Sequence, residues 1–261
     1  MYLDLSGKRA IVCGSTQGIG KASAVELASM GASITLVARN EEKLKVVLNE
    51  LDSSQGQKHD YITVDFSYPQ ELKKKVEEYL LSNTVEILIN NTGGPPAGLA
   101  INAKPEDFVN AFSEHLLCNH ILTQAVVPGM KGKKYGRIIN IISTSVKIPI
   151  KGLGVSNSVR GAVANWSKTL ANELGQFGIT VNNVLPGATM TGRLEAVLNG
   201  KAAQTGKSFD ELKGEMIEEI PMKRIAEAHE IAAAVGFLAS PAAGYINGVN
   251  IPVDGGRTGA L

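Results

Sequence analysis

Three glycines near the start of the chain have the spacing of a phosphate-binding turn. Gly14, Gly18 and Gly20 follow a short apolar strand predicted at residues 10–13, and a helical pattern follows them. Glycine lets the backbone turn tightly without a Cβ between it and a ligand, and the first N–H groups of the next helix bind anions. The order G-x-x-x-G-x-G differs from the commoner G-x-G-x-x-G. Its place at the first strand–helix junction favours phosphate binding over a role in packing alone.

Other polar or glycine-rich segments follow the later strands that the sequence predicts. They are Arg39, Asp65, N-N-T-G at residues 90–93, Ser143 and P-G-A-T-M-T at residues 186–191. In a doubly wound parallel sheet, ligands bind at the carboxyl ends of the strands. These segments therefore predict one ligand cleft along one edge of a sheet.

Apolar strands and amphipathic helices alternate along the whole chain. The predicted strands cover residues 10–13, 33–38, 61–64, 87–90, 137–142, 180–185 and 249–253. The main helices are predicted after Gly20 and at residues 41–51, 70–81, 106–127, 156–176 and 231–239. This alternation predicts a Rossmann-type, doubly wound α/β domain over residues 1–261, with a seven-stranded parallel sheet covered by helices on both faces. Residues 192–220 are polar and predict two short helices folded over the cleft.

The composition excludes several classes of protein. The chain has 261 residues, 44% of them hydrophobic, and a net charge of +1, which indicates one globular domain without a nucleic-acid footprint. No apolar run is long enough to span a membrane. The four histidines lack metal-ligand spacing, so no metal site is predicted. Two cysteines, and no signal-peptide pattern at the N-terminus, predict a cytoplasmic protein.

Taken together, these segments resemble the short-chain dehydrogenase/reductase family over essentially the whole chain, and most closely its 3-oxoacyl carrier-protein reductase-like branch. The matching segments are C-G-S-T-Q-G-I-G at 13–20, Asp65, N-N-T-G at 90–93, I-I-S at 141–143, P-G-A-T-M-T at 186–191 and V-D-G-G at 253–256. The resemblance implies hydride transfer between a nicotinamide dinucleotide and a small carbonyl or alcohol substrate. It also implies a substrate lid at residues 192–220 and a homotetramer or homodimer.

The resemblance carries cofactor roles to matching positions. Residues implied to line the pyrophosphate and ribose are Gly14, Ser15, Gln17, Gly18 and Ile19. Asp65 would bind the adenine amino group, Asn91 would lie beside the adenosine ribose, and Thr191 would hold the nicotinamide carboxamide. The remaining cofactor-binding residues implied by the same segments are Gly93, Pro186, Gly187 and Thr189. A member that prefers NAD would carry an acid where Arg39 stands, and a guanidinium pairs well with a 2′-phosphate. NADP(H) is therefore predicted rather than NAD(H).

The catalytic positions depart from the family pattern. Ser143 matches the family's serine, but Ser156 stands at its tyrosine and Arg160 at its lysine. His115 aligns with the family's asparagine. An aliphatic hydroxyl is a far poorer acid than a phenol, and arginine stays protonated in proteins. Two hydroxyls and a fixed positive charge can still stabilise a developing alkoxide.

Each of these substitutions has a second interpretation. His115 is a candidate proton donor, because imidazole titrates near neutral pH, or a hydrogen-bonded helix residue that holds a water. Asn119, one helical turn later, is an alternative to it. Ser156 could be a plain helix N-cap. Arg160 could have no role beyond binding the cofactor ribose.

The sequence therefore leaves more than one function open. The first is an NADP(H)-dependent oxidoreductase with an atypical active site. The second is an NADP(H)-binding sensor or interaction protein with little or no reductase activity. No residue points specifically to a third, lyase or dehydratase chemistry. Lys201, Lys207 and Lys213 could meet an anionic substrate, although a solvated helix face is the simpler interpretation.

Overall fold

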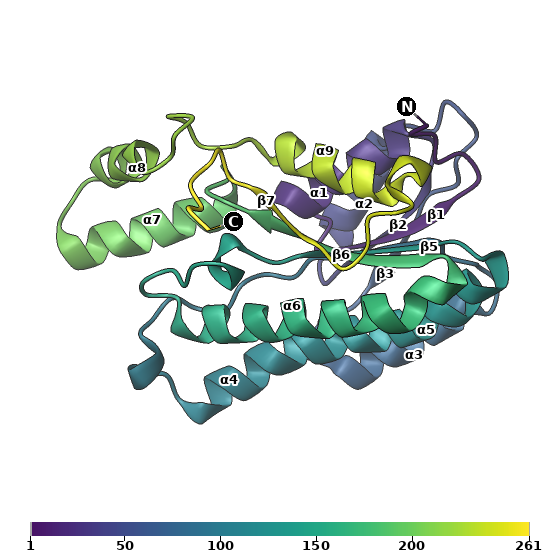
Figure 1. Ribbon diagram of the computed structural model, residues 1–261, viewed down its shortest axis with the longest axis horizontal. Helices are drawn as coiled ribbons and strands as arrows, with labels where there is room; N and C mark the ends of the chain where they lie inside the picture. The colour runs from purple at the N-terminus through teal and green to yellow at the C-terminus, as the bar shows by residue number, and fades with distance from the viewer. Residues whose placement is uncertain (1, 261) are drawn as a thin grey trace.

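The computed structural model describes residues 2–260, and within them all seven strands form one parallel sheet (Figure 1). The strands are β1 (Arg9–Cys13), β2 (Ser33–Ala38), β3 (Asp60–Thr63), β4 (Ile87–Asn90), β5 (Gly136–Ile141), β6 (Ile179–Pro186) and β7 (Asn250–Val253). Their order is β3-β2-β1-β4-β5-β6-β7, so the direction of winding reverses between β1 and β4. The predicted doubly wound sheet is confirmed, and its switch point lies beside the glycine turn after β1.

Helices cover both faces of this sheet (Figure 1). One layer contains α1 (Gly18–Ser29), α2 (Glu41–Glu50) and α9 (Ala228–Ala239), and the other contains α3 (Pro69–Leu80), α4 (Pro105–Phe112), α5 (Cys118–Lys133) and α6 (Gly154–Leu174). Leu27, Leu44 and Val235 are buried in the core of the first layer. Leu72, Leu122 and Leu174 are buried in the core of the second. Because both faces are covered, the central strands are buried on both sides and carry mostly apolar residues, with a few buried polar side chains such as Asn140 and Asn183.

Two further helices extend beyond the sheet and make up the segment predicted as the lid. They are α7 (Gly192–Thr205) and α8 (Phe209–Glu218) (Figure 1). The Thr191 hydroxyl accepts from the backbone N–H of Leu194 at 3.4 Å and caps α7. Ser208 and Glu211 form a capping box at the start of α8. The sequence pattern was therefore right about two short helices here.

The helix predicted at residues 106–127 is longer and interrupted. A π-helical turn, Ser113–Leu117, separates α4 from α5, and α5 continues through Pro128 to Lys133. A proline in a helix removes one backbone hydrogen bond. Val126 and Met130, on either side of it, are buried in the core, and this packing keeps the helix continuous.

Helix α6 begins at Gly154, two residues before its predicted start. Leu153 occupies the N-cap position without a side-chain cap, and Ser156 lies within the first turn. The interpretation of Ser156 as an N-cap is therefore wrong. Helix α9 also begins earlier than predicted, at Ala228, where Glu227 and Glu230 close its first turn.

Candidate functional site

The turn between β1 and α1 is packed so tightly that only glycine fits at three of its positions. Gly14 and Gly18 have φ of +60° and +55°, the left-handed region that favours glycine. A Cβ on Gly14 would lie 2.6 Å from the Asn91 carbonyl oxygen, and one on Gly20 would lie 2.2 Å from the Gly14 oxygen. Gln17 makes no side-chain cap to α1. The first N–H groups of α1 thus keep the capacity to bind an anion.

Asn91 holds this turn from the neighbouring strand. Its Nδ2 donates to the backbone oxygens of Cys13 at 3.2 Å and Gly14 at 3.4 Å. Ser15 is fully buried, and its hydroxyl donates to the Val37 oxygen at 3.5 Å. These polar groups shape the turn itself, whereas the contacts that the resemblance implies for them with a cofactor stay predictions.

The segment after β6 meets the glycine turn. The position of a Cβ on Gly18 lies 3.2 Å from the Thr191 Cγ2 atom. The Thr191 hydroxyl also donates to the Thr189 oxygen at 3.3 Å, and the Thr189 hydroxyl donates to the Gly187 oxygen at 3.2 Å. Gly18 and Thr191 both line a surface hollow of about 450 Å³. The structure thus brings together two segments that are far apart in the sequence.

Arg39 and Asp65 form an ion pair at the ends of β2 and β3. The guanidinium and carboxylate lie 3.8 Å apart, and the Arg39 side chain is 79% exposed. The backbone N–H of Ser67 lowers the pKa of the Asp65 carboxyl, and the charge of Arg39 lowers it further. Since the pair is long and exposed, the Arg39 guanidinium keeps open donors for a second anion.

Arg160 is a buried cation held by backbone oxygens. Its Nη1 donates to the Ile141 oxygen at 3.1 Å, at the end of β5, and its Nη2 to the Thr92 oxygen at 3.5 Å. Burial, with the nearby charge of Arg193, lowers the pKa of Arg160 to about 10. The side chain is therefore still protonated at pH 7 and supplies a fixed positive charge.

The two candidate serines both precede Arg160 in the chain, one after β5 and one in α6. Ser143 follows β5 and caps a short 3₁₀ turn, where its Oγ accepts from the backbone N–H of Ser145 at 3.1 Å. Its own hydroxyl proton remains available to a ligand. Ser156 is half-buried, one helical turn before Arg160 on the same face of α6.

His115 lies in the π-helical turn and is completely buried. Its Nδ1 shares a hydrogen bond with the Thr92 hydroxyl, and its Nε2 has no partner among residues 2–260. Burial, followed by the charges of Arg160 and Arg193, lowers the pKa of His115 to about 3. With this pKa the imidazole is neutral at pH 7, which favours the interpretation of His115 as a hydrogen-bonded helix residue over an imidazolium acid. Its part in catalysis stays a prediction.

Sequence reasoning missed two residues of this site. Thr92, inside the N-N-T-G segment, bonds both His115 and Arg160. Arg193 follows Thr191 by two residues, and its Nη2 donates to the Pro95 oxygen at 2.6 Å. The sequence signal for Arg193 was its position, since a basic residue there lies two positions after the segment implied to bind the cofactor. Asn119, the alternative to His115, is also buried, and its Oδ1 lacks a partner within the described residues.

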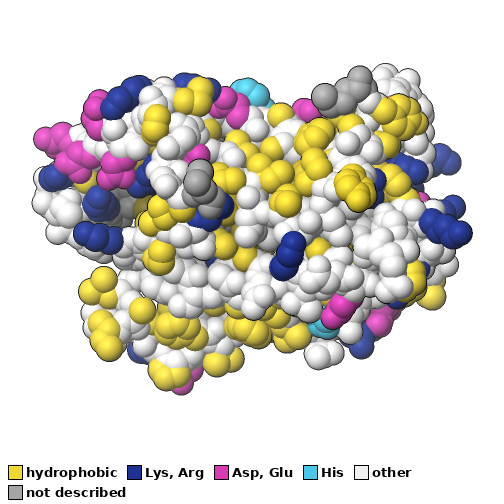
Figure 2. Space-filling view, in the orientation of Figure 1, with side chains coloured by type: hydrophobic (Ala, Val, Ile, Leu, Met, Phe, Trp, Pro, Cys, Tyr) yellow, Lys and Arg dark blue, Asp and Glu magenta, His cyan; other side chains and the backbone are white. Residues whose placement is uncertain are grey.

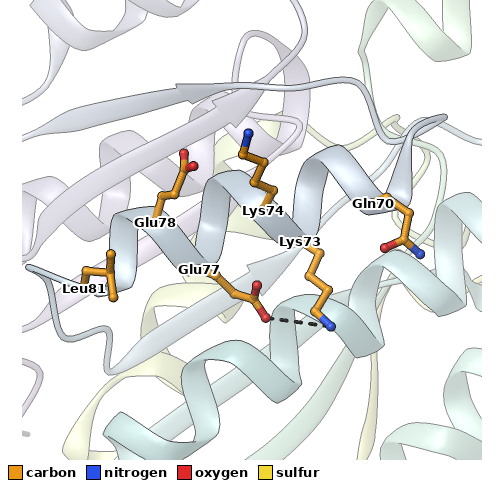
Figure 3. A pocket seen from close by; sticks show the side chains of 6 residues that line it. All are labelled: Gln70, Lys73, Lys74, Glu77, Glu78 and Leu81. Atoms are coloured by element: carbon orange, nitrogen blue, oxygen red, sulfur yellow. Dashed lines mark ion pairs between the residues drawn. The ribbon is translucent and has the colours of Figure 1, made fainter.

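A hollow on α3 contributes nothing to this site. Figure 3 shows that it is lined by side chains of that helix and by Leu81, including the ion pair between Lys73 and Glu77. These two side chains lie 3.9 Å apart and are more than half exposed, as expected of a solvated helix face. Residues 2–260 contain no group of three metal-ligating side chains. None of the helices in that range has the length and hydropathy needed to cross a bilayer.

Comparison with known proteins gives matches over nearly the whole chain. A family model described as enoyl-(acyl carrier protein) reductase matches residues 14–258. The chain is 33% identical over 253 residues to the 3-oxoacyl-[acyl-carrier-protein] reductase FabG of Haemophilus influenzae, covering 97% of this chain and 98% of that protein.

Solved structures match over the same extent. L-sorbose reductase from Gluconobacter frateurii, complexed with NADPH and L-sorbose, is 30% identical, with a TM-score of 0.93 and all of both chains covered. YwfH, described as an NADPH dependent reductase involved in bacilysin biosynthesis, is 28% identical, with a TM-score of 0.89. That match covers 98% of this chain and 100% of YwfH.

Proposed function

Since this chain belongs to the short-chain dehydrogenase/reductase family, we propose that it is an NADP(H)-dependent oxidoreductase with an atypical active site. It reduces a small carbonyl compound or oxidises the corresponding alcohol. The NADPH-dependent relatives support this proposal, as does Arg39 at the end of β2, where an NAD-preferring member would carry an acid.

The residues present fit a dinucleotide phosphate. The glycines let the turn pack tightly against Asn91 and Thr191, and the first N–H groups of α1, which lack a side-chain cap, would bind the pyrophosphate. Arg39 would hold the 2′-phosphate and Asp65 the adenine, with Thr191 at the nicotinamide end. When bound, NADP(H) supplies or accepts the hydride at the substrate carbon.

The buried charge of Arg160 carries the catalytic part of the proposal. None of the ion pairs found within residues 2–260 involves Arg160. Its positive charge therefore stabilises negative charge that develops on a substrate oxygen. The Ser143 hydroxyl, whose oxygen already accepts a backbone N–H, donates to the same oxygen. Neither serine nor the neutral His115 is an acid near pH 7, so water supplies the proton.

This lack of an acid supports a second function. The pKa values of about 3 for His115 and about 10 for Arg160 leave neither group titrating near neutrality. An NADP(H)-binding sensor or interaction protein with little reductase activity would retain the cofactor cleft and need no such group.

Consumption of NADPH tests the two functions directly. The substrates are ketones, aldehydes, quinones and 3-oxoacyl thioesters, assayed at saturating NADPH, with binding of NADPH measured on the same sample. Arg160→Ala should lower kcat at least about tenfold through lost charge stabilisation. Lys168→Ala, which removes an exposed charge from the same helix, should leave kcat unchanged.

Two other results would redirect the proposal. Unchanged turnover in Arg160→Ala would reject the role of this charge. Tight NADPH binding without turnover on any substrate would favour the binding or sensing function.

A further inference from the structure

Arg193 ties the start of α7 to the loop after β4. It is the second residue of α7, and its Nη2 donates to the Pro95 backbone oxygen at 2.6 Å. Atoms of its guanidinium lie 3.4–3.7 Å from the position that a Cβ on Gly94 would occupy. The Arg193 side chain thus lies across this loop, in van der Waals range of Gly94.

The same short loop also holds the second guanidinium of the site. Arg160 donates to the Thr92 oxygen, three residues before the oxygen that Arg193 uses. Both arginines are anchored by neutral carbonyls, and neither takes part in any ion pair formed within residues 2–260. Two positive charges, the buried Arg160 and the exposed Arg193, therefore lie against the same loop without a paired anion among the described residues.

The surroundings show the effect of these charges and provide an independent sign of a missing ligand. Burial is the main cause that lowers the pKa of Arg160 and of His115, and the charge of Arg193 lowers both further, which is consistent with its position beside the loop that anchors Arg160. The Nε2 atom of His115 is completely buried and unpartnered within the described residues. Buried polar atoms are normally hydrogen-bonded, so this one indicates a group that the chain itself does not supply.

We propose that Arg193 binds and selects for the carboxylate of an oxo-acid substrate, while Arg160 keeps the charge-stabilising role proposed above. This inference rests on the proposed reductase function, because it concerns the substrate of the same site. A planar guanidinium pairs with a carboxylate through two parallel hydrogen bonds. Of the lid lysines, Lys207 already pairs with Glu215.

A carboxylate is favoured over a cofactor phosphate by the direction in which Arg193 reaches. The glycine turn and Arg39 already provide the cationic and N–H groups for the cofactor phosphates. Arg193 lies instead against Gly94 and Pro95, and its charge acts on His115 and Arg160. Its position therefore matches the substrate side of the site.

Calorimetric titration of the protein saturated with NADP⁺ tests the proposal without requiring turnover. The probes are acetate, butyrate and phenylacetate, each compared with its uncharged amide. At least one acid should bind at least about tenfold more tightly than its amide, and Arg193→Ala should remove that difference. Arg193→Lys should restore part of it. Lys201→Ala, which removes an exposed charge from the same helix, should leave it intact.

The other outcomes overturn the proposal. If no acid binds more tightly than its amide, the site does not recognise carboxylates. If Arg193→Ala weakens NADP⁺ instead of the acids, the guanidinium belongs to the cofactor. Failure of the reductase function is distinguished from both, since it would leave acid binding intact while no carbonyl compound consumed NADPH.

Discussion

At the scale of single residues, His115 should make the protein sensitive to acid. Its pKa is about 3 in the folded protein, against about 6.5 in an unfolded chain. Between these values the unfolded chain binds more protons, so the free energy of unfolding falls as the pH falls from about 6.5 toward 3. Asparagine does not titrate in this range. Between pH 6 and pH 4, the free energy of unfolding of His115→Asn should therefore fall by about 2 kcal/mol less than that of the wild type.

Urea unfolding at both pH values and one protein concentration measures this difference. His229→Asn, exposed on α9, is the control and should follow the wild type. Equal losses in the wild type and in His115→Asn would show that the imidazole is accessible to protons in the folded state.

At the scale of elements, a ladder of asparagines joins four neighbouring strands of the sheet. Asn90, Asn140, Asn183 and Asn250 stand opposite one another in β4, β5, β6 and β7. Their side-chain amides are hydrogen-bonded in series at 2.8, 2.9 and 2.7 Å. Asn140 also donates to the Ser167 hydroxyl of α6 at 3.2 Å. The ladder thus connects these four strands to the helix that carries Arg160.

Removing the central amide of this ladder should be costly. Asn140 is completely buried, and Asn140→Leu would leave buried groups of Asn90, Asn183 and Ser167 unpaired. The expected loss is about 2–4 kcal/mol in the free energy of unfolding, measured by urea denaturation. Asn250→Leu, at the exposed end, should cost less than about 1 kcal/mol. If both variants lost the same free energy of unfolding, the buried hydrogen bonds of Asn140 would contribute no more than those of the exposed Asn250.

The ladder also shows what a sequence pattern can and cannot predict. The strands and the glycine turn follow from local periodicity and spacing, and the structure has them close to where they are predicted. The pairing of Asn90 with Asn140 depends on the register between strands, which local patterns do not contain. The contact of Arg193 with Pro95 joins residues 98 positions apart. The neutral state of His115 depends on its burial, which also became known only from the fold.

At the scale of the whole molecule, the surface of α4 and the following turn is unusually apolar. Val109, Phe112 and Leu117 are 66%, 47% and 41% exposed. Figure 2 shows hydrophobic side chains gathered over the region that α4 occupies in Figure 1. Contiguous apolar patches of this kind mark interaction surfaces. The homotetramer or homodimer implied by the family resemblance would cover it with a second copy of the chain.

Charges placed on this surface should therefore break up an assembly. In a twofold interface each substitution occurs twice, so Val109→Asp with Phe112→Asp would bury four carboxylates between two copies. Burying unpaired charges is strongly unfavourable, and the double variant should have a lower mass by light scattering at the same protein concentration. Leu81→Asp changes an isolated residue that is 88% exposed and should leave the mass unchanged. If the double variant kept the wild-type mass, copies of the chain would have to associate through another surface, and the apolar face of α4 would be open to a different partner.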